Sequence, residues 1–239
     1  MRSVKVKICG LKSEEDVRLC MKPGVDILGL VTEYPLPVPW NLSRAGALPL
    51  LNIIQSPWES CIVTGGSPNK IIELAACLRP SLVQLHYKET LEETIIISDA
   101  LRKLNIDVIK TVPFKMEDRI LQFGTGDIET IIEELCGTSV FGLLADSRGP
   151  SNASANGTGL DPEFCSRIIN LSSKPVIIAG GINAGNVCNV LRQTGAGFID
   201  VMTGVESSPG KKDARSLSCL LKAVQSPGDH PEIKRDTGG

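Results

Sequence analysis

Short apolar runs recur along the chain and alternate with longer stretches in which apolar side chains return every three or four positions. The first pattern is typical of buried strands and the second of amphipathic helices. We predict eight strands, which cover residues 4–9, 25–31, 60–64, 82–86, 107–111, 140–145, 175–179 and 198–202.

Helix signals lie between these runs. Ser13 precedes three acidic residues and Ser67 precedes a proline, which are typical N-terminal signals of helices. Further helices are predicted at 91–104, 128–136, 162–170, 184–193 and 214–224. Strands that alternate with helices over this length predict an α/β fold, a single (β/α)8 TIM barrel formed by residues 1–225.

An open, doubly wound sheet is the alternative fold. It is disfavoured because no G-x-G-x-x-G motif follows the first strand, where a dinucleotide-binding fold would carry it. Residues 226–239 are polar, contain glycine and proline and show no periodicity, so we expect a mobile C-terminal tail.

Composition narrows the class of protein. The 239 residues carry a formal net charge of −2, which gives no reason to expect nucleic acid or an anionic membrane as a partner. No apolar run approaches the roughly 20 residues that cross a bilayer, and no signal-peptide core follows the N-terminal charges. The eight cysteines are scattered without a C-x-x-C pair, which favours a reducing, cytoplasmic compartment. With two histidines in the chain, we expect no histidine-rich metal site.

Several reactive side chains follow the predicted strands. Cys9, His86, Asp146 and Asp200 lie at the C-terminal ends of four different strands, the end at which barrel enzymes place their active sites. Taken alone, Cys9 reads as a core thiol and Asp146 as a helix cap. Together, a thiol and a carboxylate at strand ends suit an isomerase that moves protons.

Two glycine-containing turns follow the last two strands. Gly180 and Gly181 precede one predicted helix, and Thr203 and Gly204 follow the next strand. Glycines allow backbone N–H groups to approach an oxyanion, and a helix N-terminus adds favourable partial charge. Either turn alone could be a tight connection, but the pair predicts a phosphate site, because barrels of this type bind phosphate after strands seven and eight.

The ordered motifs resemble those of the phosphoribosylanthranilate isomerase family of tryptophan biosynthesis over nearly the whole chain. They are Lys7-Ile8-Cys9-Gly10-Leu11, Gln84-Leu85-His86, Leu144-Ala145-Asp146-Ser147, Gly157-Thr158-Gly159, Ala179-Gly180-Gly181-Ile182-Asn183 and Asp200-Val201-Met202-Thr203-Gly204-Val205-Glu206. The resemblance implies an Amadori rearrangement of N-(5-phosphoribosyl)anthranilate, the third step of tryptophan biosynthesis from chorismate. It also implies a small phosphoribosyl substrate and no cofactor, since one acid and one base suffice. By this resemblance Cys9 is the base, Asp146 is the acid and Asp200 lies beside the ribose hydroxyls.

Both catalytic groups would need pKa values closer to neutrality, the thiol downward and the carboxyl upward. Lys7 shares a strand face with Cys9, so its charge could favour a thiolate. A structural ion pair deeper in the barrel explains Lys7 equally well.

The loop after the second strand departs from the family. The family's Ser-Pro-Arg, whose arginine meets the anthranilate carboxylate, is absent from residues 32–44. We expect Arg148 to take this role, with Arg44 as the rival and neither as the third possibility. Tyr34 and Trp40 in the same loop either stack on the aromatic ring or pack over the barrel rim. Residues 148–156 form a long loop, predicted as a lid or a mobile insertion.

Two other functions remain open. Thr64-Gly65-Gly66-Ser67 could bind a second phosphate, as in related dual-substrate isomerases of histidine synthesis, although a helix-capping turn is preferred. Those enzymes carry an aspartate where this chain has Cys9. A noncatalytic phosphate-binding barrel is the other alternative, and binding alone would not require both Cys9 and Asp146. The sequence does not predict an oligomeric state.

Overall fold

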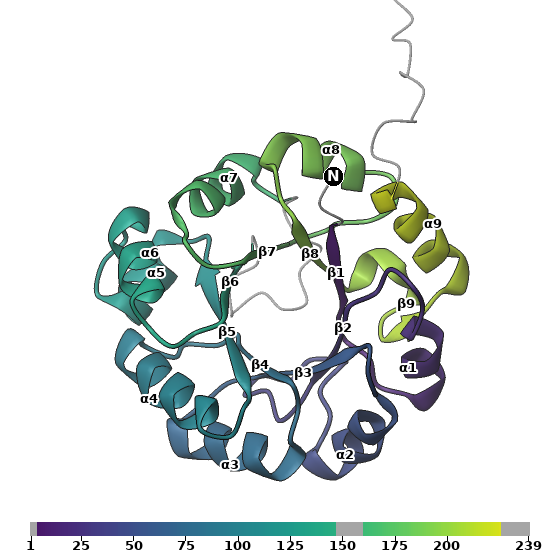
Figure 1. Ribbon diagram of the computed structural model, residues 1–239, viewed down its shortest axis with the longest axis horizontal. Helices are drawn as coiled ribbons and strands as arrows, with labels where there is room; N and C mark the ends of the chain where they lie inside the picture. Colours follow the sequence, from purple (N-terminus) through teal and green to yellow (C-terminus); the bar gives the residue numbers. More distant parts are fainter. Residues whose placement is uncertain (1–3, 147–159, 226–239) are drawn as a thin grey trace, which may run out of the picture.

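Eight parallel strands close into a barrel in the computed structural model, which describes residues 4–146 and 160–225 (Figure 1). Each strand pairs with its sequence neighbours, and the first pairs with the last, Lys7 lying opposite Asp200. The strands are β1 (Lys5–Ile8), β2 (Ile27–Val31), β3 (Glu59–Thr64), β4 (Leu82–Leu85), β5 (Asp107–Pro113), β6 (Gly142–Asp146), β7 (Val176–Ala179) and β8 (Phe198–Val201). The predicted (β/α)8 fold and all eight predicted strands are therefore confirmed.

Helices surround the barrel as an outer ring (Figure 1). They are α1 (Glu14–Cys20), α2 (Arg44–Ile53), α3 (Pro68–Leu78), α4 (Leu91–Arg102), α5 (Met116–Phe123), α6 (Ile128–Cys136), α7 (Pro162–Leu171), α8 (Val187–Thr194) and α9 (Ala214–Gln225). After β8 come a 3-10 turn, η2 (Thr203–Val205), and a hairpin of β9 (Glu206–Ser208) and β10 (Lys211–Lys212).

Two apolar layers hold this arrangement. Strand residues that point inward fill the barrel, and those that point outward pack against the helices. The inner layer contains Ile27, Cys61, Leu82, Ile109, Leu144, Ile177, Ala179 and Phe198. Because these side chains fill the middle of the barrel, we look for a ligand site at its ends.

Helix α5 and the hairpin were not predicted. In α5 the polar Arg119 and Gln122 are buried, whereas Met116, Ile120 and Leu121 are exposed. This reverses the expected distribution and hides the helical period. The helix predicted at 184–193 begins later, at Val187, because the side chains of Asn183 and Asn186 bond to neighbouring backbone N–H groups and keep 183–186 as a turn.

Other predictions concern the compartment and the chain ends. All eight cysteines are free, and no described helix is long and apolar enough to cross a membrane. The predicted C-terminal tail, residues 226–239, and the predicted 148–156 loop lie outside the described residues.

Candidate active site

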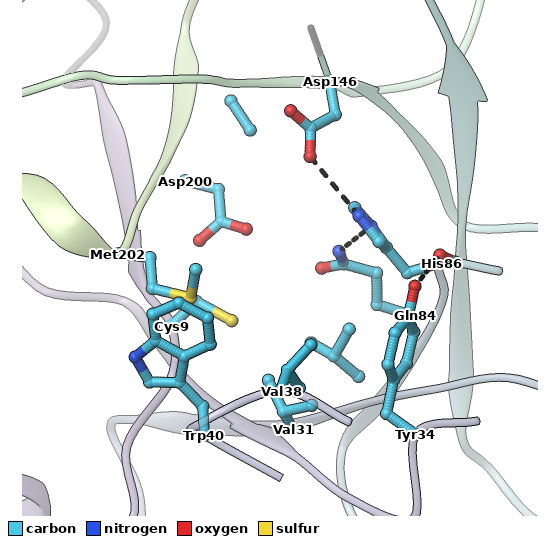
Figure 2. Close-up of a pocket in the computed structure, with 12 residues that line it drawn as sticks. Cys9, Val31, Tyr34, Val38, Trp40, Gln84, His86, Asp146, Asp200 and Met202 are labelled. Carbon is cyan, nitrogen blue, oxygen red and sulfur yellow. Dashed lines mark hydrogen bonds and ion pairs between the residues drawn. The ribbon is translucent and has the colours of Figure 1, made fainter. Parts of the chain in front are cut away.

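The C-terminal mouth of the barrel contains a pocket with about 600 Å³ of empty space, including its opening. Its lining comes from seven strands or the loops that follow them: Cys9, Val31, Tyr34, Val38, Trp40, Val63, Gln84, His86, Asp146, Ala179, Asp200 and Met202. Four of the predicted site residues, Cys9, His86, Asp146 and Asp200, thus share one pocket (Figure 2).

His86 and Asp146 form the polar end of this pocket. The imidazole Nε2 lies 3.4 Å from Asp146 Oδ2, while Nδ1 lies 3.0 Å from Gln84 Nε2 and 2.9 Å from Thr111 Oγ1. An amide nitrogen can only donate, so Nδ1 accepts and the ring proton is on Nε2, facing Asp146. Asp146 itself is 1% exposed.

Lys7 lies beneath the pocket rather than on its lining. Its ammonium is completely buried, 2.7 Å from Asp200 Oδ2. Burial alone would lower the pKa of Lys7, but Asp200 and the neighbouring sulfurs outweigh that effect and raise the pKa, so Lys7 remains charged. The structure therefore supports the ion-pair explanation for Lys7.

The pKa of Cys9 shifts in the direction opposite to the one expected. Burial raises the pKa of the Cys9 thiol above its ordinary value, whereas Lys7 acts in the opposite direction. The prediction of a lowered thiol pKa is therefore wrong. The Lys7 charge is already paired with Asp200, and the Asp200 charge itself raises the Cys9 pKa. Lys7 therefore does not compensate for the hydration that the Cys9 thiolate loses on burial.

The opposite wall of the pocket is apolar and comes largely from the loop after β2. Tyr34 and Trp40 are each 6% exposed and pack in one cluster with Cys9, Val31 and Val63. This cluster is called the aromatic wall below. Both aromatic rings line the pocket in addition to packing at the rim.

The β2 loop is held by its own hydrogen bonds. The side chain of Asn41 accepts from Tyr34 N and donates to Tyr34 O, both at 2.9 Å. The Tyr34 hydroxyl donates to the backbone oxygen of His86 at 2.9 Å. These contacts tie the aromatic wall to the strand that carries His86.

The two glycine turns predicted to bind phosphate touch each other. A β-carbon on Gly204 would overlap the carbonyl oxygen of Ile182 and lie 2.9 Å from Asn183 Cβ. Gly180 and Gly181 adopt positive φ angles of 124° and 63°. The structure thus brings these turns together, and it places Thr203 on the exposed side of the second one.

Arg44 does not face the pocket. Its guanidinium lies 2.9 Å from Glu73 Oε1 and 3.4 Å from Glu33 Oε1. Two carboxylates thus already hold this arginine at the start of α2. Arg148, the other arginine predicted to meet a carboxylate, lies outside the described residues, as does Gly157-Thr158-Gly159.

The glycine turn after β3 is occupied by protein. Gly66 N donates to Glu89 Oε1 at 3.0 Å, and a β-carbon on Gly65 would lie 2.8 Å from the same oxygen. A carboxylate therefore sits where a second phosphate would have to bind. The turn leads into α3 with Ser67 at the N-cap position, as the preferred interpretation expects, although the Ser67 side chain makes no capping hydrogen bond.

Comparisons with known proteins agree with these features. A family model described as N-(5'phosphoribosyl)anthranilate (PRA) isomerase matches residues 6–223. An isomerase of that name from Nitrobacter winogradskyi is 31% identical, over 93% of this chain and 93% of its own. The chain belongs to the N-(5'-phosphoribosyl)anthranilate isomerase family.

Other relatives of this isomerase family extend the comparison. The enzyme from Methanosarcina acetivorans is 28% identical, over 92% of this chain and 93% of its own. The solved phosphoribosyl anthranilate isomerase from Thermotoga maritima aligns with a TM-score of 0.75 and 25% identity, over 93% of this chain and 99% of its own. A second solved structure, a phosphoribosyl anthranilate isomerase, shares the fold at 24% identity and a TM-score of 0.72, over 93% of this chain and 99% of its own.

Sequence reasoning missed several residues of the isomerase pocket. Gln84 and Thr111 hold the His86 ring, yet neither was assigned a role. Gln84 lies two positions before His86, so strand alternation could have placed both side chains on the inner face. No comparable signal marks Glu206, which accepts a hydrogen bond from Trp40 across the barrel mouth.

Proposed function

We propose that this chain converts N-(5-phosphoribosyl)anthranilate into 1-(2-carboxyphenylamino)-1-deoxyribulose 5-phosphate, with Cys9 as general base and Asp146 as general acid. The observation that carries the proposal is that Cys9 and Asp146, from β1 and β6, line one pocket at the C-terminal mouth. The homologous structure in complex with a reduced form of this product supports the substrate class.

The first step opens the ribose ring. Asp146 gives a proton to the furanose ring oxygen, the bond from that oxygen to C1′ breaks, and the nitrogen lone pair forms a protonated Schiff base. The His86 Nε2 atom lies 3.4 Å from Asp146 Oδ2, so the imidazole is placed to hold this carboxyl group in the pocket.

The second step moves the proton at C2′. The Cys9 thiolate removes it, and the electrons of the C–H bond neutralise the Schiff base to give an enol-amine, which becomes the ketone. Because burial raises the pKa of Cys9, the thiolate is a minor form near neutral pH. Turnover needs the Cys9 thiolate together with a protonated Asp146, so kcat/KM should not keep rising with pH above about 8.5, the ordinary thiol value.

Asp200 and the glycine turns would bind the rest of the sugar phosphate. Asp200 Oδ2 is held by Lys7, while its buried Oδ1 has no hydrogen-bond partner among the described residues. A ribose hydroxyl that donates to Oδ1 would satisfy this oxygen. The touching turns at Ile182 and Gly204 would bind the phosphate through backbone N–H groups.

Freshly prepared N-(5-phosphoribosyl)anthranilate and the purified protein provide the test. Turnover is followed as the decay of the adduct's fluorescence, with the Cys9→Ala, Asp146→Asn double variant as the matched control. We expect decay with the wild type at a rate far above that of the control. Equal rates would exclude the proposal and favour the noncatalytic barrel.

A further inference from the structure

The aryl ring of the proposed substrate has one place to lie. The phosphate turns follow β7 and β8, and the reacting carbons lie between Cys9 and Asp146. Strands β3 and β7 are opposite one another in a closed barrel of this order. A substrate with its phosphate at β7 and β8 therefore extends its other end toward β2 and β3, where the aromatic wall lies.

Trp40 gives the aromatic wall a large ring whose orientation is fixed by hydrogen bonding. Figure 2 shows Trp40 beside Cys9 and Met202, on the side of the cavity away from Asp146 and His86. The indole Nε1 donates to Glu206 Oε1 at 3.0 Å, and the same oxygen lies 2.8 Å from Lys212 Nζ. Lys212 Nζ also donates to Met202 O at 3.1 Å.

The ion pair between Glu206 and Lys212 is buried. The side chains of Lys212 and Glu206 are 0% and 4% exposed. A buried ion pair contributes little net stability, because desolvation of both charges offsets their attraction, and such pairs can instead fix a conformation. The conformation fixed here is that of an indole whose ring faces the pocket.

The loop after β1 leaves room for the same indole. Gly10 has a φ of 75°, and a β-carbon there would lie 2.9 Å from the Met202 side chain and 3.0 Å from Trp40 Cδ1. Three loops, after β1, β2 and β8, thus converge on Trp40. This convergence goes beyond what burial of one tryptophan requires.

We propose that Trp40 recognises the aryl ring of the substrate and that Glu206 and Lys212 form a positioning pair for its indole. The proposal rests on the proposed function and adds a specificity residue from the loop that departs from the family. Aromatic pairs that stack or meet edge to face gain affinity beyond the area that they bury.

Two stable ligands separate ring binding from phosphate binding. One is the reduced product, 1-(2-carboxyphenylamino)-1-deoxyribitol 5-phosphate, which carries the ring. The other is D-ribitol 5-phosphate, which carries the sugar phosphate alone. Neither requires turnover, so the result is independent of the catalytic roles of Cys9 and Asp146.

The first measurement is the effect of Trp40→Leu on both dissociation constants. We expect the Kd of the reduced product to rise roughly 10-fold and that of ribitol 5-phosphate to stay within about twofold. Trp58→Phe, which alters the chain's other tryptophan outside the pocket, should change neither. An unchanged Kd for the reduced product in Trp40→Leu would overturn the proposal.

A second measurement does not require Trp40→Leu to fold. In Trp58→Phe the only indole is Trp40. Its emission should be strongly quenched by the reduced product and nearly unaffected by ribitol 5-phosphate. Equal responses to the two ligands would place the aryl ring elsewhere and overturn the proposal.

The positioning pair is tested with two matched double variants. Glu206→Gln with Lys212→Met removes both charges but keeps an acceptor for the indole N–H, whereas Glu206→Leu with Lys212→Met removes the acceptor too. We expect the second variant to bind the reduced product several-fold more weakly than the first, with equal Kd values for ribitol 5-phosphate. Identical affinities would refute the positioning role. If the wild type binds the reduced product through Trp40 yet fails to turn over substrate, the proposed function alone is wrong.

Discussion

Replacing Gly204 with alanine should push apart the two turns that we assign to the phosphate. A β-carbon at Gly204 would overlap the carbonyl oxygen of Ile182 and lie 2.9 Å from its carbonyl carbon. Non-bonded carbon atoms pack at about 3.5–4.0 Å, so these two must separate by at least about 0.6 Å, and the overlap with the oxygen demands more. The two turns cannot both keep their present positions.

The expected loss of function follows from this displacement. A misplacement of about 1 Å can cost on the order of 10²-fold when several groups must converge on one ligand. Backbone donors to the phosphate bind substrate and transition state alike, so the loss should appear in KM and less in kcat. Overpacking should also lower the free energy of unfolding by about 1–3 kcal/mol.

The assay compares KM for N-(5-phosphoribosyl)anthranilate with the Kd of D-ribitol 5-phosphate. Both should rise by similar factors in Gly204→Ala and further in Gly204→Val. Gly197→Ala is the matched control, because a β-carbon there would meet nothing within 4 Å. If Gly204→Ala bound ribitol 5-phosphate as tightly as the wild type, the phosphate would have to lie elsewhere.

The other predictions each address a single side chain or, for the arginines, two rival side chains. Cys9→Ala should lower kcat by about 10²–10⁴-fold and leave the Kd of the reduced product unchanged. Activity above about a tenth of wild type would remove Cys9 from the mechanism. Asp146→Asn should abolish turnover but still bind the reduced product, since much weaker binding would instead indicate a binding or folding role. Arg44→Ala should leave KM unchanged because Glu33 and Glu73 hold this arginine. Loss of Arg148, by contrast, should raise KM about 10–100-fold if this arginine meets the carboxylate, and the opposite result for the two arginines would reverse the assignment. Burial raises the pKa of Cys61 to about 12, so the folded state keeps a proton that the unfolded chain loses above about pH 8.5. The free energy of unfolding should fall from there toward pH 11, and Cys61→Val should reduce that fall in denaturant titrations.

Sequence alone determined the fold and the end of the barrel at which the site lies. Buried parallel strands read as short continuous apolar runs, and this local signal survives because neighbouring strands and helices cover both faces. Cys9 and Asp146 follow such runs directly, so their shared location was predictable from topology. Helix α5 was missed because three of its apolar side chains are exposed and two of its three buried ones are polar.

The tertiary structure alone decided how the groups interact. Whether Lys7 lowers the pKa of Cys9 depends on a competition between burial and a paired charge, and Asp200, 193 positions away, takes part in it. Likewise the Trp40 indole meets Glu206 across 166 positions, from loops with no common periodicity. Local patterns record which face a residue presents, whereas desolvation and hydrogen bonding depend on every element that closes over it. The sequence therefore predicted that Cys9, His86, Asp146 and Asp200 lie at one end of the barrel, and only the folded chain decided which partners each of them contacts.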